Sequence, residues 1–189
     1  MFKKSILLAT MLGLASIANA ASFNLDVSSS DWWEIDGSER NFKFTAPVAD
    51  ANAKFSFVLQ GFNTVDGANG YADQFSFQLN DIEIAGGLFD LGGGGFNIKF
   101  GGSSTSSLIA IDTPNKTVTF SNLPINLLEG TNMFTFKYTP LSGSSQGLAD
   151  EAWKLNSATI TAAVPEPESY AMLLAGLGLM GAMARRRKN

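Results

Sequence analysis

The sequence predicts an all-β protein, an antiparallel two-sheet sandwich of jelly-roll type, flanked by an N-terminal signal peptide and a C-terminal short transmembrane helix. Apolar and polar residues alternate with a period of two in one segment after another between residues 21 and 163. Turn-forming clusters separate these segments, and the long apolar runs lie at the two ends of the 189-residue chain. We therefore divide the chain into a signal peptide over 1–20, a β-sandwich domain over 21–163 and a C-terminal signal over 164–189.

The N-terminal segment has the three parts of a secretory signal peptide. Lys3 and Lys4 supply positive charge, Ser5 to Ile17 form an apolar run, and Ala18 and Ala20 belong to an A-x-A cleavage site. The apolar run is too short to span a bilayer comfortably, and the small residues follow it at the expected place. We expect cleavage after Ala20 and export of the remaining chain.

The middle of the chain predicts about nine or ten short strands, each with one buried face. Successive side chains of a strand point to opposite faces, so period-two alternation indicates a sheet with one face exposed to solvent and the other buried. The clearest segments are 41–44, 54–59, 74–79, 81–84, 96–100, 117–120, 133–138 and 154–162, and turn signals lie at 66–70, 92–95, 113–116, 128–132 and 142–147. The residues expected on buried faces are Phe42, Phe44, Phe55, Phe57, Leu59, Phe75, Phe77, Leu79, Ile82, Ile84, Phe96, Ile98, Phe100, Val118, Phe120, Phe134, Phe136 and Tyr138.

The C-terminal segment begins with a proline-bracketed glutamate and continues as an apolar run. Pro165 and Pro167 flank Glu166, and each proline favours an extended chain, so Val164 to Pro167 should form a stiff, unpaired stretch open to a processing enzyme. The uncharged run 169–184 would rise about 24 Å as a helix, short of a hydrocarbon core of about 30 Å. Such a helix spans only with local thinning and is a poor permanent anchor.

A cluster of positive charge closes the chain. Arg185, Arg186, Arg187 and Lys188 directly follow the apolar run. Positive residues beside a membrane segment remain on the cytoplasmic side. We therefore expect a cytoplasmic C-terminus and a folded domain on the outer side.

The order of these features resembles the PEP-CTERM sorting signal of Gram-negative bacteria. The resemblance covers Val164 to Asn189: Pro165, Glu166 and Pro167 carry the motif, "YAMLLAGLGLMG" the helix and "ARRRKN" the basic tail. It implies export, transient attachment to the inner membrane, processing by an exosortase, and release to the cell surface or extracellular matrix. Proteins with this signal are commonly associated with exopolysaccharide and biofilm. Permanent anchoring is the competing interpretation.

A second resemblance lies within the predicted sandwich. Tyr71-Ala72-Asp73-Gln74-Phe75, followed by alternating residues, is similar to the F-x-D-x-F pattern that names one PEP-CTERM subfamily. Tyr71 stands where that pattern has its first Phe. The resemblance implies no chemistry for this chain.

Composition excludes several classes of function. Between Ala21 and Val164, seven Lys or Arg face fifteen Asp or Glu, a formal charge of −8, and a surface of this sign repels nucleic-acid phosphates. Cys and His are absent from the chain. Disulfides, Cys/His zinc sites and Ser-His-Asp or Cys-His nucleophiles are therefore excluded.

Trp32 and Trp33 are candidate sugar-binding residues because they lie in the acidic segment "DWWEIDGSE". Exposed indole rings can stack on sugars, and nearby carboxylates can accept hydrogen bonds from hydroxyls. Neighbouring residues of a strand point to opposite faces, so at most one of the two should point outward. Packing of both into the core and its rim is the alternative.

Asp66, Asn69 and Asp73 are candidate calcium ligands because calcium prefers hard oxygen donors. Asp150 and Glu151 offer carboxylates in a second loop. The spacing matches neither the EF-hand loop nor the nonapeptide calcium repeat. Turns rich in Asn and Asp explain the same residues without an ion, and no other cofactor is expected.

Three functions are compatible with these observations. The first is a non-enzymatic surface or matrix protein that is exported, processed by an exosortase and associated with exopolysaccharide. The second is a carbohydrate-binding module with an aromatic or calcium-assisted sugar site. The third is a glycosidase that uses Asp81 with Glu83, predicted to share a strand face, or Asp150 with Glu151. Neither pair lies in a recognisable motif and the domain is small for a carbohydrate-cleaving cleft, so we expect no enzyme.

Overall fold

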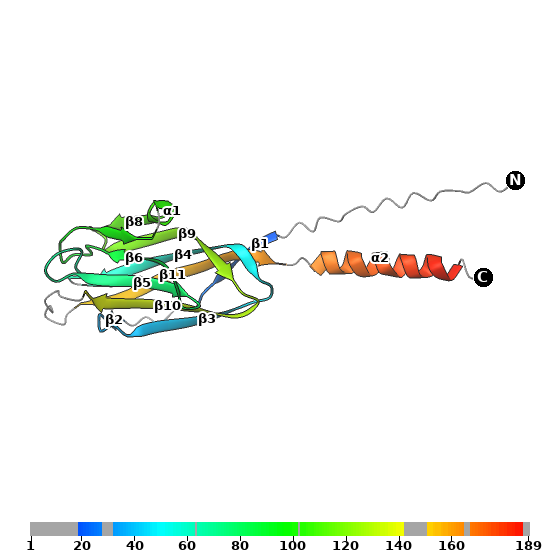
Figure 1. Ribbon diagram of the computed structural model, residues 1–189, viewed down its shortest axis with the longest axis horizontal. Helices are drawn as coiled ribbons and strands as arrows, with labels where there is room; N and C mark the ends of the chain where they lie inside the picture. The colour runs from blue at the N-terminus through cyan, green and yellow to red at the C-terminus, as the bar shows by residue number, and fades with distance from the viewer. Residues whose placement is uncertain are drawn as a thin grey trace. The chain divides into compact units, whose positions relative to one another are not determined.

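The computed structural model describes residues 19–27, 32–62, 64–101, 103–141, 151–164 and 167–186. Within these ranges, eleven strands form two antiparallel sheets, which confirms the predicted jelly-roll-like sandwich (Figure 1). The chain divides into two compact units, one of which is Ala20–Val164. Residues 1–18 of the predicted signal peptide, including Ala18, lie outside the described residues, whereas Asn19 and Ala20 belong to the first strand.

The first sheet is built around the two longest strands of the domain. Its order is β1-β11-β4-β9-β8, and β2 also pairs with β11. β4 and β11 are each 13 residues long, and a β-bulge between Leu155 and Ser157 interrupts the alternation of β11. The strands are β1 (Asn19–Asn24), β2 (Trp33–Glu34), β4 (Asp50–Phe62), β8 (Ile109–Asp112), β9 (Thr117–Leu127) and β11 (Ala152–Val164).

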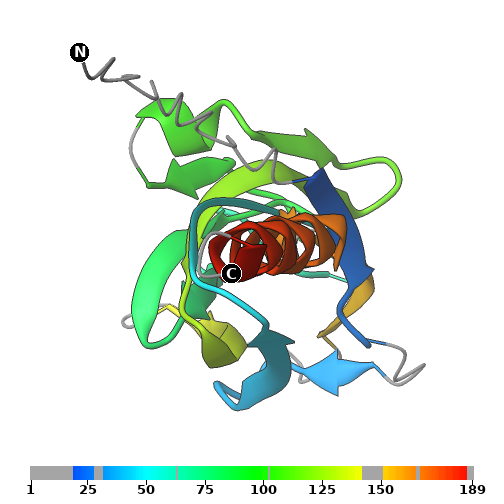
Figure 2. The same ribbon diagram turned by 90° about the vertical axis from the view of Figure 1, so that its right-hand side faces the viewer.

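The second sheet packs face to face with the first. Its order is β3-β10-β5-β6-β7, and each neighbouring pair is antiparallel. Its strands are β3 (Glu39–Ala46), β5 (Asp73–Leu79), β6 (Ile82–Leu88), β7 (Ile98–Phe100) and β10 (Gly130–Pro140). A short helix, α1 (Ser103–Ser106), follows β7. Figure 2 shows the strands end-on.

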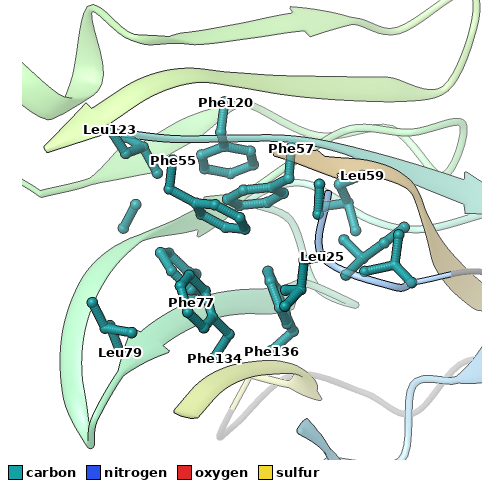
Figure 3. Packing of buried hydrophobic residues seen from close by; sticks show 14 of the residues in the cluster. Leu25, Phe55, Phe57, Leu59, Phe77, Leu79, Phe120, Leu123, Phe134 and Phe136 are labelled. Carbon is teal, nitrogen blue, oxygen red and sulfur yellow. The ribbon is translucent and has the colours of Figure 1, made fainter. Parts of the chain in front are cut away.

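Aromatic rings from both sheets fill the space between them. Phe55 and Phe57 of β4 project toward Phe77 of β5 and Phe136 of β10 (Figure 3). All four are essentially inaccessible to solvent. The predicted inward face is therefore confirmed for β4, β5, β9 and β10, where Leu59, Phe75, Leu79, Val118, Phe120, Phe134 and Tyr138 are also buried.

The predicted burial is wrong for Phe96 and Ile98, at the edge strand β7, and for Ile82, the first residue of β6. Phe96 and Ile98 are 79% and 41% exposed, and Ile82 is 66% exposed. β7 is a short edge strand that pairs only with β6 among the described residues, so its side chains have few neighbours. Phe89, just after β6, is fully buried and fills the core in this region.

The turn between β5 and β6 corrects a second expectation. Leu79 pairs with Ile82, so Asn80 and Asp81 alone form the turn, with φ angles of 50° and 65°. A two-residue hairpin turn with positive φ at both positions is typical of Asn and Asp. Asp81 therefore lies in the turn and not in the strand. The prediction that it shares a strand face with Glu83, as a carboxylate pair, is wrong.

The predicted C-terminal helix is present as α2 (Pro167–Arg186). Proline suits the first position of a helix because its missing N–H would have no partner there. Across the described residues, no helix has both the length and the apolar character that crossing a membrane requires.

Candidate functional site

Three carboxylates meet at one end of the sandwich. Asp66 lies in the loop between β4 and β5, Asp73 is the first residue of β5, and Glu151 immediately precedes β11. One carboxylate oxygen of each lies within 4.8 Å of those of the other two. Asp66 and Asp73 are buried and Glu151 is half-buried. We call these three residues the acidic cluster.

Strand pairing explains why Glu151 joins residues that lie far away in the sequence. Ala152, the first residue of β11, pairs with Phe62, the last residue of β4. Glu151 is therefore held beside the start of the loop that carries Asp66. Asp66, Asn69 and Asp73 were predicted as ligands in one loop, and Glu151 was predicted with Asp150 in a second loop; Asp150 lies outside the described residues.

A glycine-rich segment supports the loop that carries Asp66. The backbone N–H groups of Leu91 and Gly93 donate to the Val65 carbonyl, at 3.0 and 3.2 Å. A Cβ atom at Gly93 would lie 2.3 Å from the Thr64 carbonyl oxygen and 2.6 Å from Asp66 Oδ1, so only glycine fits this position. The segment connects β6 to β7, as predicted, and also packs directly against the acidic cluster.

Asn69, predicted as a ligand, positions Asp66 instead. Its Nδ2 donates to Asp66 Oδ1 at 2.6 Å, and its Oδ1 accepts a hydrogen bond from the Tyr71 backbone N–H at 2.6 Å. Both ends of the amide are thus in use within the loop. Asp66 and Asp73 are joined further, because the Asp66 backbone N–H donates to Asp73 Oδ2 at 3.1 Å.

Burial raises the pKa of Asp73 to about 6. The hydrogen bond from the Asp66 N–H opposes this effect, and the negative charge of Asp66 adds to it. Close like charges in a poorly solvated place favour the protonated acid. The cluster is therefore a place where a proton or a cation is bound readily.

The charges of the same three carboxylates act on the Tyr138 hydroxyl. Tyr138 is completely buried, and its Oη has no hydrogen-bond partner in the described part of the chain. Burial raises its pKa well above the usual value, and the charges of Asp73, Glu151 and Asp66 raise it further. Sequence reasoning assigned Tyr138 to the core and missed its electrostatic interaction with the acidic cluster.

The two adjacent tryptophans point in different directions, as alternation predicted. Trp33 is half-buried, and its ring packs edge-on against Trp153, with 4.7 Å between ring centroids. Trp32 is 37% exposed and lies 5.0 Å from the ring of Phe62, which is 44% exposed. Lys154 Nζ lies 4.6 Å from the Trp32 ring centroid. We call Trp32, Phe62 and Lys154 the Trp32 surface.

The C-terminal signal follows the sandwich without a long spacer. Val164 is the last residue of β11, and Pro167 already begins α2. Val164 and Pro167, predicted to be the ends of an unpaired stretch, thus belong to β11 and α2. The two residues between them, Pro165 and Glu166, lie outside the described residues. Arg185 and Arg186 form the last turn of α2, and the other two basic residues, Arg187 and Lys188, are also outside the described ranges.

A comparison with protein families identifies this segment. Residues 163–188 match the model of the PEP-CTERM protein-sorting motif. The chain carries a PEP-CTERM sorting motif. This confirms the resemblance noted for Val164 to Asn189, and the motif implies an exported protein that an exosortase processes after transient attachment to the membrane. The match does not reach Tyr71–Phe75, so the F-x-D-x-F subfamily is not confirmed.

The PEP-CTERM chain also has distant structural similarity to solved proteins. It is similar to dimeric latent PorU from Porphyromonas gingivalis (TM-score 0.41, 13% identity), covering 79% of this chain but only 13% of that one. It is also similar to a family 35 carbohydrate-binding module from an environmental isolate, with a TM-score of 0.34 and 14% identity, covering 81% of this chain and 96% of that one. A third similar structure is CBM35 from Cellvibrio japonicus Abf62, with a TM-score of 0.30 and 11% identity, covering 76% of this chain and 95% of that one. No curated protein matches the sequence.

Proposed function

We propose that this chain is a non-enzymatic protein of the cell surface or extracellular matrix that associates with exopolysaccharide after exosortase processing. The observation that carries the proposal is the PEP-CTERM motif, which starts where the last strand of the sandwich ends. Cleavage within the motif would leave every strand of the sandwich on the released side. The released part is then a folded module that lacks the C-terminal helix and basic tail.

The chemistry of the sandwich supports a binding role over a catalytic one. The chain has no His or Cys, and Asp81, one member of a candidate carboxylate pair, lies in an exposed turn. The acidic cluster is largely buried, which suits structural binding of a small ion better than attack on a polymer. A hydrated polysaccharide would instead meet the exposed faces of the sandwich.

A carbohydrate-binding module with a defined sugar site is the second candidate, and the Trp32 surface favours it. Two partly exposed aromatic rings offer apolar area for a sugar ring, and the Lys154 ammonium can donate hydrogen bonds to sugar oxygens. The Lys154 ammonium already lies over the Trp32 ring, so a sugar would replace a cation–π contact. Trp33 is engaged with Trp153 and contributes no open face of similar size.

The processing step is tested by intact mass of the protein recovered from culture medium. We expect the released protein to lack the basic tail in a host with an exosortase, and to remain cell-associated in a strain without the enzyme. Replacing Pro165, Glu166 and Pro167 together by Ala should abolish release. Glu168→Gln, which changes the next acidic residue, is the matched control and should be released normally. A full-length secreted chain that retains Arg187 and Lys188 would contradict the proposal.

The binding step is tested by retention of the released protein on exopolysaccharide from the same host. We expect retention by the wild-type protein and no turnover of the polymer. If the Trp32 surface is the site, Trp32→Ala should reduce retention at least tenfold, whereas Phe96→Ala, at an exposed aromatic residue elsewhere, should not. Equal retention of both variants favours diffuse association, and release of oligosaccharides would exclude the non-enzymatic role.

A further inference from the structure

Asp66, Asp73 and Glu151 meet the distance requirement for binding a single ion. Two oxygens that bind the same calcium ion at about 2.4 Å are at most about 4.8 Å apart. The oxygens offered by the three carboxylates all lie within 4.8 Å of one another. Asp66 and Asp73 lie seven residues apart, whereas Glu151 is distant in sequence, so the fold itself brings the third carboxylate to the other two.

Asp66 and Asp73 have no basic partner among the residues that the structure describes. Asp66 Oδ1 accepts from the Asn69 amide, and Asp73 Oδ2 accepts from the Asp66 backbone N–H. Both residues are more than 90% buried. Buried like charges destabilise a fold unless a proton or a cation neutralises them.

Tyr138 provides a second, independent indication of a ligand at this point. Its hydroxyl is fully buried and has no partner among the described residues. Tyr138 pairs with Phe75 in the sheet, two positions along β5 from Asp73 and on the same inward face. A buried donor without an acceptor is costly, so the hydroxyl is poised to donate to an acceptor that the described residues do not supply.

We infer that Asp66, Asp73 and Glu151 bind a calcium ion, and that the Tyr138 hydroxyl donates a hydrogen bond to a water molecule on that ion. The donor set consists of oxygen alone, which selects a hard cation. Magnesium needs regular octahedral geometry and retains most of its water, whereas calcium tolerates the irregular set that a loop and two strand ends provide. Asn69 is a positioning residue that holds the Asp66 carboxylate toward the ion.

The ion would tie three parts of the sandwich together. It links the loop after β4, the start of β5 in the second sheet and the residue before β11 in the first sheet. Extracellular calcium modules bind with dissociation constants of about 10⁻⁴–10⁻³ M, so such a site fills outside the cell. This inference goes beyond the proposed function and depends on neither polysaccharide binding nor processing.

The test is the thermal stability of the full chain, purified in mild detergent, in calcium and in chelator. We expect millimolar calcium to raise Tm by about 3–6 °C over the value in EGTA, and magnesium to have little effect. Terbium, which replaces calcium, gives an independent readout. The rings of Tyr138 and Trp153, 5.9 Å apart at their centroids, should sensitise its emission, and excess calcium should quench that emission.

Variants separate ion binding from a structural role of the carboxylates. Asp73→Asn keeps the acceptor for the Asp66 N–H but should abolish both the calcium shift and terbium emission. In EGTA its Tm should equal or exceed that of the wild type, because one buried like charge is removed. Asp81→Asn, at the opposite end of β5, removes the same charge from an exposed turn and should leave the calcium shift unchanged.

Tyr138→Phe tests the hydroxyl alone. The ring and its packing remain, and we expect a calcium affinity about tenfold weaker. The inference is overturned if the wild-type Tm is the same in calcium and EGTA, if magnesium matches calcium, or if the shift survives in Asp73→Asn. It is also overturned if Asp73→Asn lowers Tm equally in both solutions, since the carboxylate would then act only within the protein.

Discussion

Phe57 of β4 stacks on Phe120 of β9, with 4.2 Å between ring centroids and 13° between ring planes. Both rings are essentially inaccessible to solvent. Neighbouring strands of the first sheet thus support the core with paired rings, and rings of the second sheet pack against them. Phe57 also contacts Phe77 and Phe136 edge-on, so it connects both sheets.

Phe57→Ala should lower the free energy of unfolding by about 3–5 kcal/mol. The cause is the lost burial of the ring and the cavity left among its neighbours. Urea unfolding followed by tryptophan fluorescence measures the change. Phe96→Ala is the matched control, because that ring is 79% exposed, and it should change stability by no more than about 0.5 kcal/mol. Equal losses in the two variants would contradict the assignment of the core.

Stability in chelator should rise as pH falls from 7 to 5, through Asp73. Its pKa is raised to about 6 in the folded chain from 3.8, so between these values the folded state binds more protons than the unfolded state. Between pH 7 and pH 5 this contribution favours the acid side by about 1 kcal/mol. Because other carboxylates titrate too, the quantity to measure is the difference in Tm between wild type and Asp73→Asn at each pH. A difference that does not change with pH would contradict the raised pKa.

Asn132→Ala should cost about 2–4 kcal/mol, although no apolar area of note is lost. Asn132 is fully buried, and its amide accepts from the Leu128 N–H at 2.9 Å and donates to the Leu128 carbonyl at 2.8 Å. Its Oδ1 also accepts from the Asn80 amide at 3.0 Å. Removal leaves these partly buried groups unpaired. Chemical unfolding is the measurement, and a loss below about 0.5 kcal/mol would show that water replaces the amide.

Asp81→Val should destabilise the domain by about 1–2 kcal/mol, whereas Asp81→Gly should be close to neutral. The φ angle of 65° at this position is disfavoured for a β-branched residue and accessible to glycine. Glu83→Val, also exposed but within β6, controls for the loss of a surface charge. If Asp81→Val and Glu83→Val behave alike in chemical unfolding, the turn conformation is wrong.

The period-two alternation predicted most of the sandwich because each long strand faces the core on one side along its whole length. β5, and β4 from Ala53 onward, keep this pattern, and β10 departs from it at Thr135, which is also buried; their inward apolar residues are buried as expected. The segment "FNIKF" around the edge strand β7 has the same pattern, but Phe96 and Ile98 remain exposed. A pattern in sequence cannot tell a central strand from an edge strand, because that depends on how the chain pairs.

The same limit applies to the candidate sites. Asp66 and Asp73 are close in sequence, so a single loop was enough to suggest them together. Glu151 reaches them only through the pairing of Ala152 with Phe62. Phe62 likewise meets Trp32 through tertiary structure alone. Local chemistry could therefore be read from the sequence, and contacts between distant segments could not.

The position of β11 has a mechanical consequence for a protein held by its C-terminus. β11 lies between β1 and β4 in the first sheet, and the sorting motif continues directly from its last residue. Drag on the tethered sandwich is therefore transmitted along β11, and it loads the hydrogen bonds on both sides of that strand in shear. Bonds loaded in shear must fail together, whereas those of a peeled edge strand break one after another. The sorting motif is thus joined to a strand that resists extraction from the sheet until the exosortase processes the protein.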